Sequence, residues 1–329
     1  MIQLYSDGLL STKWKCNNIT SSLPVHQMIL SLCKSLLWLT LLIISGAQHS
    51  LSGQMLPDTL LANPWIQLPI EGRMTDIELD EEGNIYLLEP SKHKLHKWFA
   101  DRGYDSTLTI GGKGVSGEGL NKPSQIRVTN RQAVYCLDLM NRRLLVLNTN
   151  LKIVKEVNFL TLEQNNRMGD QGNQIWPIGF EVAPTGDLFL LNQEDNKILK
   201  VDVFGRLQTA FGGLDYGEGS LPDPNEILMN EQNLLFVTDT VAQEIKVFDL
   251  FGIYKYTIKP NPDFRFQGIA VMGNNLLLYN AVDIILYNIM TQRERRIQVQ
   301  TRGGRIIDVD ISHRILAILT ENEVILYQI

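Results

Sequence analysis

The chain repeats one unit of short strands six times between Met74 and Ile329. Each unit contains an apolar strand, a turn rich in glycine and asparagine, a second apolar strand, a polar turn and a third strand. The second strands are centred on a bulky or small apolar residue, in order Tyr86, Tyr135, Phe189, Phe236, Leu278 and Ala317. A strand-built period of roughly 40 to 50 residues is typical of a β-propeller. We therefore predict an all-β fold, a six-bladed β-propeller.

The two ends of the repeat region predict how the ring closes. The last unit stops at Ile329, directly after its third strand, so its blade lacks a fourth strand. Residues 64–69 precede the first unit and have no blade of their own. Because an array of strands with open edges is prone to association, we expect this N-terminal strand to complete the last blade.

The N-terminal region differs from the rest. Residues 36–44 form an uninterrupted apolar run, with Lys34 before it and small residues ending at Ala47 after it. This pattern predicts a secretory signal peptide within residues 1–47, cleaved after Ala47, with Met28 as an alternative start. The other interpretation is an uncleaved membrane anchor, because the apolar stretch is nearly long enough to span a bilayer. An exported protein, periplasmic or extracellular, follows from either.

The remaining boundaries follow directly: residues 48–63 are a leader and residues 64–329 form the propeller. The formal net charge is −6, which argues against nucleic acid as a partner, because phosphate binding needs a basic face. Of the three cysteines, only Cys136 lies in the propeller, and it sits within an apolar strand. We expect a buried, inert thiol there, with a reactive thiol as the alternative.

Two connections between units are near copies, residues 110–123 and 211–224, and both combine Gly-Glu-Gly with a later proline. Residues 186–205 add Gly-Asp before an apolar strand and Asn-Lys-Ile before a Phe-Gly turn. These motifs resemble the NHL repeat, and the similarity extends over residues 64–329, with the second to fourth units matching best. The resemblance implies a six-bladed propeller. It implies no reaction, because that family includes both binding modules and enzymes.

Five residues in the connections are candidates for partner binding. Trp176 precedes a proline, Tyr216 lies in a glycine-rich loop, and Phe264, Arg265 and Phe266 lead into the fifth unit. Aromatic and arginine side chains on rigid loops often anchor protein or glycan partners. The alternative is that these rings pack beneath their own loops.

Two further sets of residues recur on the same face. A basic and polar set in the turns between second and third strands suggests either a solvated rim or an anion site: His93, Arg142, Arg143, Asn196, Lys197 and Gln243. An acidic or amide residue ends the second strand in four of the units: Glu89, Asp138, Asn192 and Asp239. We expect each of these side chains to hydrogen-bond the backbone of its own turn, and the alternative is a metal site.

Catalytic interpretations need donor sets that converge. A calcium-dependent lactonase would draw oxygen ligands from the inner strands and strand ends, for which the candidates are Glu78, Glu181, Glu226, Asp310, Asn192 and Asp239. A zinc-dependent lyase needs several histidines, and no convergent set is legible among His49, His93, His96 and His313.

The sequence thus favours an exported, non-catalytic binding or scaffold module without a cofactor. Its partner would be a protein, peptide or glycan held by the blade-connecting loops. The alternative is a lactonase-like or lyase-like enzyme that depends on Ca or Zn, with its site at the channel mouth.

Overall fold

A computed structural model describes residues 64–129, 133–166, 174–312 and 314–328. The predicted signal peptide and leader lie outside the described residues. Within the described ranges, no helix is both long and apolar enough to cross a membrane.

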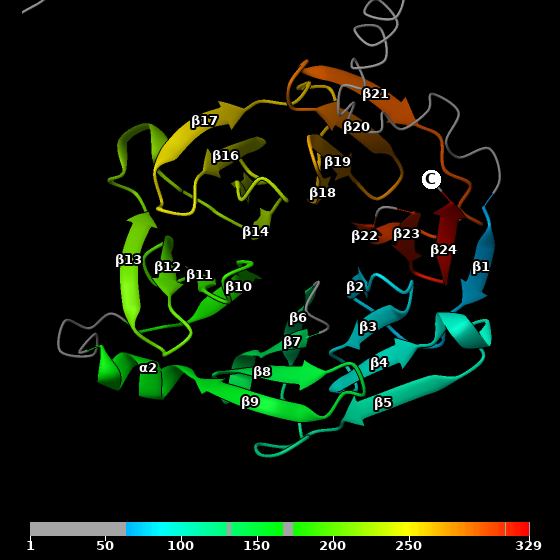
Figure 1. The fold of residues 1–329 in the computed structure, drawn as a ribbon. Coiled ribbons are helices and arrows are strands. Elements are labelled where there is room, and N and C mark those ends of the chain that lie inside the picture. The colour runs from blue at the N-terminus through cyan, green and yellow to red at the C-terminus, as the bar shows by residue number, and fades with distance from the viewer. Residues whose placement is uncertain (1–63, 130–132, 167–173, 313, 329) are drawn as a thin grey trace, which may run out of the picture. The chain divides into compact units, whose positions relative to one another are not determined.

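The described residues form six four-stranded antiparallel sheets arranged in a ring, which confirms the predicted six-bladed propeller (Figure 1). Blades 1 to 3 consist of β2(Asp76–Leu79), β3(Ile85–Glu89), β4(Lys94–Trp98), β5(Thr107–Gly111); β6(Pro123–Thr129), β7(Ala133–Asp138), β8(Arg143–Asn148), β9(Ile153–Asn158); and β10(Pro177–Val182), β11(Leu188–Asn192), β12(Lys197–Val201), β13(Leu207–Gly212). Blades 4 to 6 consist of β14(Glu226–Met229), β15(Leu235–Asp239), β16(Glu244–Phe248), β17(Tyr254–Ile258); β18(Gly268–Met272), β19(Asn275–Tyr279), β20(Ile284–Asn288), β21(Arg293–Ile297); and β22(Ile306–Ile311), β23(Ile315–Thr320), β24(Glu323–Gln328), β1(Ile66–Pro69). In each blade the first-named strand lines the channel and the last-named strand lies at the rim, so β1 is the outermost strand of blade 6 (Figure 1).

The ring closes through the N-terminal strand, as predicted. β1 pairs antiparallel with β24, with Ile66 opposite Leu326 and Pro69 opposite Glu323. The last blade is therefore built from both ends of the propeller region. This pairing covers the edge that β24 would otherwise present to another chain.

The apolar core lies between the blades. Each of six buried clusters in the described residues draws its side chains from two neighbouring blades. One of them joins Tyr86 of β3 to Leu145 of β8, and it also contains Cys136, which is fully buried. Burial raises the pKa of the Cys136 thiol and so keeps it protonated. This agrees with the buried, inert thiol that the sequence predicts.

One element has no counterpart in the repeat pattern. The helix α2(Phe159–Asn165) follows β9 and begins at Asn158, whose side chain accepts a hydrogen bond from the Thr161 amide. Phe159 and Leu162 are buried in the cluster between blades 2 and 3. The Asn166 side chain, directly after the helix, donates to the carbonyl of Gly205.

The disc has two faces with different connections. The loop face carries the connections between blades and the turns between second and third strands. The opposite face carries the turns between first and second strands and those between third and fourth strands. β1 begins at the opposite face, because its first paired residue lies beside Leu326 near the end of β24, and the chain then runs to the loop face at Ile70.

Closure by β1 generates a stability prediction. Leu68 packs against the cluster between blades 6 and 1, whereas the neighbouring Gln67 accepts a hydrogen bond from Arg302 on the other side of the strand. We expect Leu68→Asp to lower the free energy of unfolding by about 2–4 kcal/mol, because a charge replaces an apolar contact. We expect Gln67→Asp to cost less than about 1 kcal/mol. Urea unfolding of both variants checks this, and equal stabilities would mean that β1 does not dock.

Candidate functional site

The channel is lined by polar side chains around one cation. Arg127 on β6 donates from Nη1 to Glu78 Oε1 at 2.7 Å. Its Nε lies 3.5 Å from Glu181 Oε2 and its Nη2 lies 3.6 Å from Glu226 Oε1. Strands of four different blades thus contribute to one ionic cluster. The sequence analysis placed the three glutamates on inner strands but missed Arg127, although it occupies an inward position among acidic neighbours.

The channel side chains also satisfy the free edges of the innermost strands of blades 1 to 3. An innermost strand pairs on one side only, so alternate N–H groups face the channel without a strand partner. Asp308 of blade 6 accepts from the Ile77 amide of blade 1 at 2.9 Å, and Asp76 of blade 1 accepts from the Ile126 amide of blade 2 at 2.6 Å. Each side chain therefore links its blade to the next.

Three more inner side chains make the same link. They are Asp310 to the Leu79 amide at 2.7 Å, Glu78 to the Val128 amide at 3.1 Å, and Gln125 to the Phe180 amide at 2.8 Å. We call this set, with Asp76 and Asp308, the inner-edge relay. The relay places several carboxylates close together, and one guanidinium cannot balance them all.

The charge imbalance appears as raised pKa values. Burial is the largest cause for each group: it raises the pKa of Asp308 to about 8, of Glu226 to about 7 and of Asp310 to about 6. The neighbouring Asp76 raises the pKa of Asp308 further, and the Tyr279 hydroxyl lowers it by donating to Asp308 Oδ1 at 2.8 Å. Burial also raises the pKa of Asp76. Part of the channel is therefore protonated near neutral pH.

The geometry does not favour the calcium interpretation. Glu78, Glu181 and Glu226 do converge, but on the guanidinium of Arg127, and Asp310 is engaged by a backbone amide. Among the described residues, no three or more His, Cys, Asp or Glu side chains are arranged to hold a metal ion. The carboxylate cluster that the sequence suggested is thus explained by strand-edge hydrogen bonding and by one buried ion-pair network.

The histidines within the described ranges are engaged outside the channel. His93 Nδ1 accepts from the Lys122 amide at 3.0 Å. His96 lies between Glu89 and Thr109, and burial lowers its pKa. These two rings do not supply the convergent set that a zinc site needs.

On the loop face, the turn residues tie each blade to the connection that leads into the next. His93, Arg142, Asn196 and Gln243 all adopt positive φ, between 49° and 59°. Asn196 donates to the Pro222 carbonyl at 2.7 Å. Gln243 donates to the Phe266 carbonyl at 3.0 Å and accepts from the Phe266 amide at 2.8 Å.

The other two complete the pattern. Arg142 donates to the Ile175 carbonyl at 3.1 Å and pairs with Glu163, while His93 makes the bond to the Lys122 amide described above. These four residues, which we call the turn latches, are structural links. All four are half-buried rather than fully solvated, and an anion site on these turns stays a prediction.

Of the strand-end residues, Asp239 accepts from the backbone of its own turn, as expected, whereas Asp138 and Asn192 accept from the backbone of the connection that precedes their blade. Asp138 accepts from the Asn121 amide at 2.7 Å, and Asn192 accepts from the Trp176 amide at 2.6 Å. Asp239 accepts from the Ala242 amide at 2.7 Å. These bonds fix the height and direction of the connections that carry the candidate binding residues.

Two of the five candidate binding residues are partly open. Trp176 is half-buried, with the Arg142 guanidinium 4.8 Å above its ring. Tyr216 keeps 40% of its surface exposed and donates its hydroxyl to the Gly252 carbonyl at 2.9 Å. Both rings are held in fixed orientations by these contacts.

The other three differ from one another. Phe264 and Phe266 are only 5% and 1% exposed, because both rings pack into the cluster between blades 4 and 5. The expectation that these two rings are exposed is wrong, and they lie beneath their own connection. Arg265, between them in the chain, is exposed.

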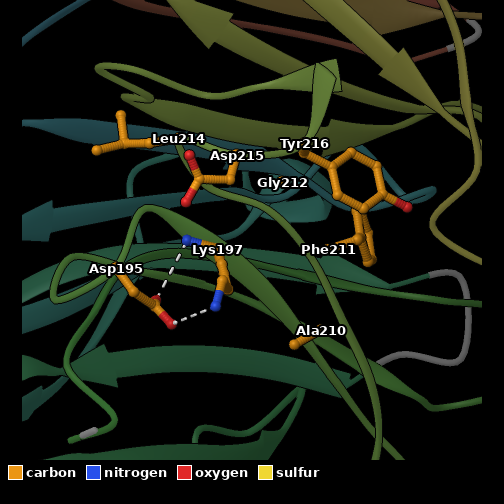
Figure 2. A pocket seen from close by; sticks show the side chains of 8 residues that line it. All are labelled: Asp195, Lys197, Ala210, Phe211, Gly212, Leu214, Asp215 and Tyr216. Atoms are coloured by element: carbon orange, nitrogen blue, oxygen red, sulfur yellow. Dashed lines mark hydrogen bonds and ion pairs between the residues drawn. The ribbon is translucent and has the colours of Figure 1, made fainter. Parts of the chain in front are cut away.

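Two neighbouring pockets open on the loop face. One, of about 350 Å³, lies between the Asp195–Lys197 turn of blade 3 and the connection that carries Leu214 and Tyr216 (Figure 2). In it, Lys197 pairs with the Asp195 carboxylate at 3.7 Å. The other, of about 590 Å³, is lined by Thr240, Gln243, Arg265, Phe266 and Gln267. Tyr216, Arg265 and Phe266 among the candidates thus line these two pockets.

Comparisons with known proteins identify the fold. Neither a family model nor a curated protein matches the sequence. A catalytically inactive variant of virginiamycin B lyase from Staphylococcus aureus, solved with quinupristin, is 12% identical with a TM-score of 0.54, over 79% of this chain and 81% of that one. A streptogramin B lyase is 13% identical with a TM-score of 0.54, over 78% and 79%.

A chain of the mitotic checkpoint complex is 10% identical with a TM-score of 0.56, over 98% of this chain and 99% of that one. At these identities the likeness concerns the propeller fold alone. Because the neighbours include both lyases and a component of a checkpoint assembly, the fold is compatible with catalysis and with binding.

Removal of the central cation has a predictable cost. Arg127→Met leaves buried carboxylates without their counter-ion, and we expect a loss of about 3–5 kcal/mol in the free energy of unfolding at pH 8. The loss should be smaller at pH 5, where the carboxyls with raised pKa values are protonated. Chemical unfolding at both pH values measures it, with Arg102→Met, an exposed arginine, as the control. A loss that does not depend on pH would contradict the proposed charge balance.

The relay also predicts how stability depends on pH. Folding raises the pKa of Asp308 from 3.8 to about 8, so between these values the native state binds more protons than the unfolded state. The free energy of unfolding contributed by this group is therefore full below pH 4 and is lost as the pH rises through about 8. Asp308→Asn should flatten that decline, as measured by thermal unfolding from pH 4 to 9. An unchanged slope, equal to that of the exposed-site variant Asp101→Asn, would refute this assignment.

Proposed function

We propose that the protein is an exported binding or scaffold module that holds a protein or peptide partner on the loop face of blades 3 to 5. The observation that carries this proposal is the pair of adjacent pockets, which are lined by Tyr216 and Arg265. Consecutive blades repeat the same geometry, so an extended segment that fills one pocket can continue into the next.

The chemistry of this surface suits a peptide with both apolar and charged side chains. Leu214 and Val241 are exposed beside the pockets, and Tyr216 presents one side of its ring. Asp195, Lys197 and Arg265 supply charges of both signs. Interfaces typically combine a few such aromatic, aliphatic and arginine anchors with polar surroundings.

The loops are also rigid enough to bind without a large ordering cost. The latches Asn196 and Gln243 fix the two connections that form the pockets, and the Tyr216 hydroxyl is tied to blade 4. A surface already held in one conformation loses little conformational entropy on association. The resemblance to NHL repeats and the propeller fold are both consistent with such a role.

An enzyme is the second possibility, and the partly exposed carboxyl of Glu226 in the channel is the observation that favours it. The solved lyases are other proteins with this fold that catalyse a reaction, so a propeller of this kind is compatible with catalysis. In this chain, however, the channel carboxylates contact Arg127 and backbone amides, and His93 and His96 are engaged elsewhere. The binding role therefore has the stronger support.

A phage-displayed random peptide library tests the binding role directly. We expect peptides to be enriched on the wild-type protein and to lose about 2 kcal/mol or more of binding free energy on the double variant Tyr216→Ala, Arg265→Glu, since both pockets lose an anchor. Isothermal titration of the selected peptides measures the change.

Val115→Asp is the matched control, because Val115 is an exposed apolar residue on the connection between blades 1 and 2, away from both pockets. Peptides that bind the double variant as tightly as the wild type would place binding elsewhere. No enrichment at all would count against a peptide-binding function.

A further inference from the structure

The face opposite the pockets carries a repeated turn that directs one residue outward. Between third and fourth strands, the side chains of Asn148, Asp202 and Asp249 each accept a hydrogen bond from the amide two residues further on, at 2.9–3.0 Å. Asn288 caps the equivalent turn of blade 5 by accepting from the Thr291 amide at 2.9 Å. The residue two positions after each cap therefore lies at the tip of its turn.

Three of these tips are apolar and almost fully exposed. They belong to consecutive blades, which lie side by side in Figure 1: Phe204 is 79% exposed, Phe251 is 76% exposed and Met290 is 74% exposed. The tip of blade 2 is the polar Asn150. Exposed Val203 and Ile253 flank the two phenylalanines. Exposed apolar side chains that recur at the equivalent turn of three consecutive blades are candidates for an interaction surface.

The N-terminal part of the chain joins the propeller at this same face. β1 starts here, and Trp65, directly before it, is 52% exposed. In the sequence, residues 45–63 join the apolar run at residues 36–44 to this face, and a chain of that length spans at most roughly 60–70 Å when extended.

Cationic side chains accompany the aromatic tips. The Arg206 guanidinium lies 5.1 Å from the centre of the Phe204 ring and pairs with Asp202 at 2.8 Å, and its side chain is 68% exposed. Lys255 is also exposed, 3.9 Å from Asp249 in the turn of Phe251. Aromatic rings that reach the acyl boundary, with cations at headgroup level, are the pattern of a surface that lies on a bilayer.

We propose that this face docks on the surface of a lipid bilayer through Phe204, Phe251, Met290 and Trp65. The apolar tips enter the interfacial region, and Arg206 and Lys255 contact anionic headgroups. The propeller then lies flat on the membrane, and its loop face points away, toward the aqueous phase. This membrane contact is independent of what the loop face binds.

Site-specific fluorescence on vesicles tests the proposal. Single variants Phe204→Cys and Val241→Cys, in a background of Cys16→Ser and Cys33→Ser, are labelled with an environment-sensitive dye; Cys136 is buried and does not label. Val241 is the matched control, because it is an equally apolar turn residue exposed on the loop face. The probe is a vesicle of phosphatidylcholine and phosphatidylglycerol in a 3:1 ratio, with a spin-labelled lipid as quencher.

We expect a blue shift and quenching for the dye at position 204 and neither for the dye at position 241. Quenching at both positions, at position 241 alone, or at neither would overturn the proposal. A second measurement avoids the dye: the double variant Phe204→Glu, Phe251→Glu should lower vesicle partitioning at least roughly tenfold, since burial of one phenylalanine is worth about 1.5–3 kcal/mol. Val241→Glu, Val282→Glu should leave partitioning unchanged, and an equal loss in both pairs would contradict a face-specific contact.

Discussion

The free inner edge of each blade is the constraint on which the rest of the structure depends. Each blade has one free strand edge at the rim and one at the channel, and the six innermost strands face the channel with N–H groups that have no strand partner. Here the side chains of the preceding blade supply the acceptors, as Asp308 does for Ile77 and Asp76 does for Ile126. The consequence is a channel crowded with carboxyl groups. The positive charge of Arg127 and the protonation of some carboxyl groups then offset the negative charge that these hydrogen-bond acceptors bring together.

Strand-edge hydrogen bonding accounts for a channel rich in the residue types that a calcium site uses. Carboxylate and amide side chains could either bind calcium or accept hydrogen bonds from the N–H groups at the strand edges. The two roles differ in whether the oxygen lone pairs point toward a metal ion or toward a backbone amide. Glu78 shows the distinction most clearly, because one of its oxygens accepts from Arg127 and the other from the Val128 amide. On the outer surfaces, by contrast, the latched connections and capped turns present exposed side chains such as Tyr216 and Phe204.

The strand pattern of the sequence predicted most of the fold, because the apolar side chains of each second strand, such as Phe189 and Phe236, fill the space between blades whatever the connections do. The closing strand was also predictable, since the last unit lacked a fourth strand.

The candidate site was less predictable. Phe264 and Phe266 were expected on the surface, yet their connection folds so that both rings enter the core, and no local pattern distinguishes these arrangements. Arg127 was overlooked because its role depends on three glutamates brought in from other blades. The turn latches depend in the same way on contacts between blades.

Amide hydrogen exchange reports whether side chains of the neighbouring blade shield the inner-edge amides from water. On the channel side, the amides of Ile77, Ile126 and Phe180 have no strand partner and donate to side chains of the neighbouring blade. While the relay is intact, these side chains keep the three amides out of contact with bulk water. The account predicts that they exchange only through global unfolding, as slowly as amides in the middle of β7 or β11. Exchange as fast as that of the exposed turn amides, for example those around Phe204, would contradict it.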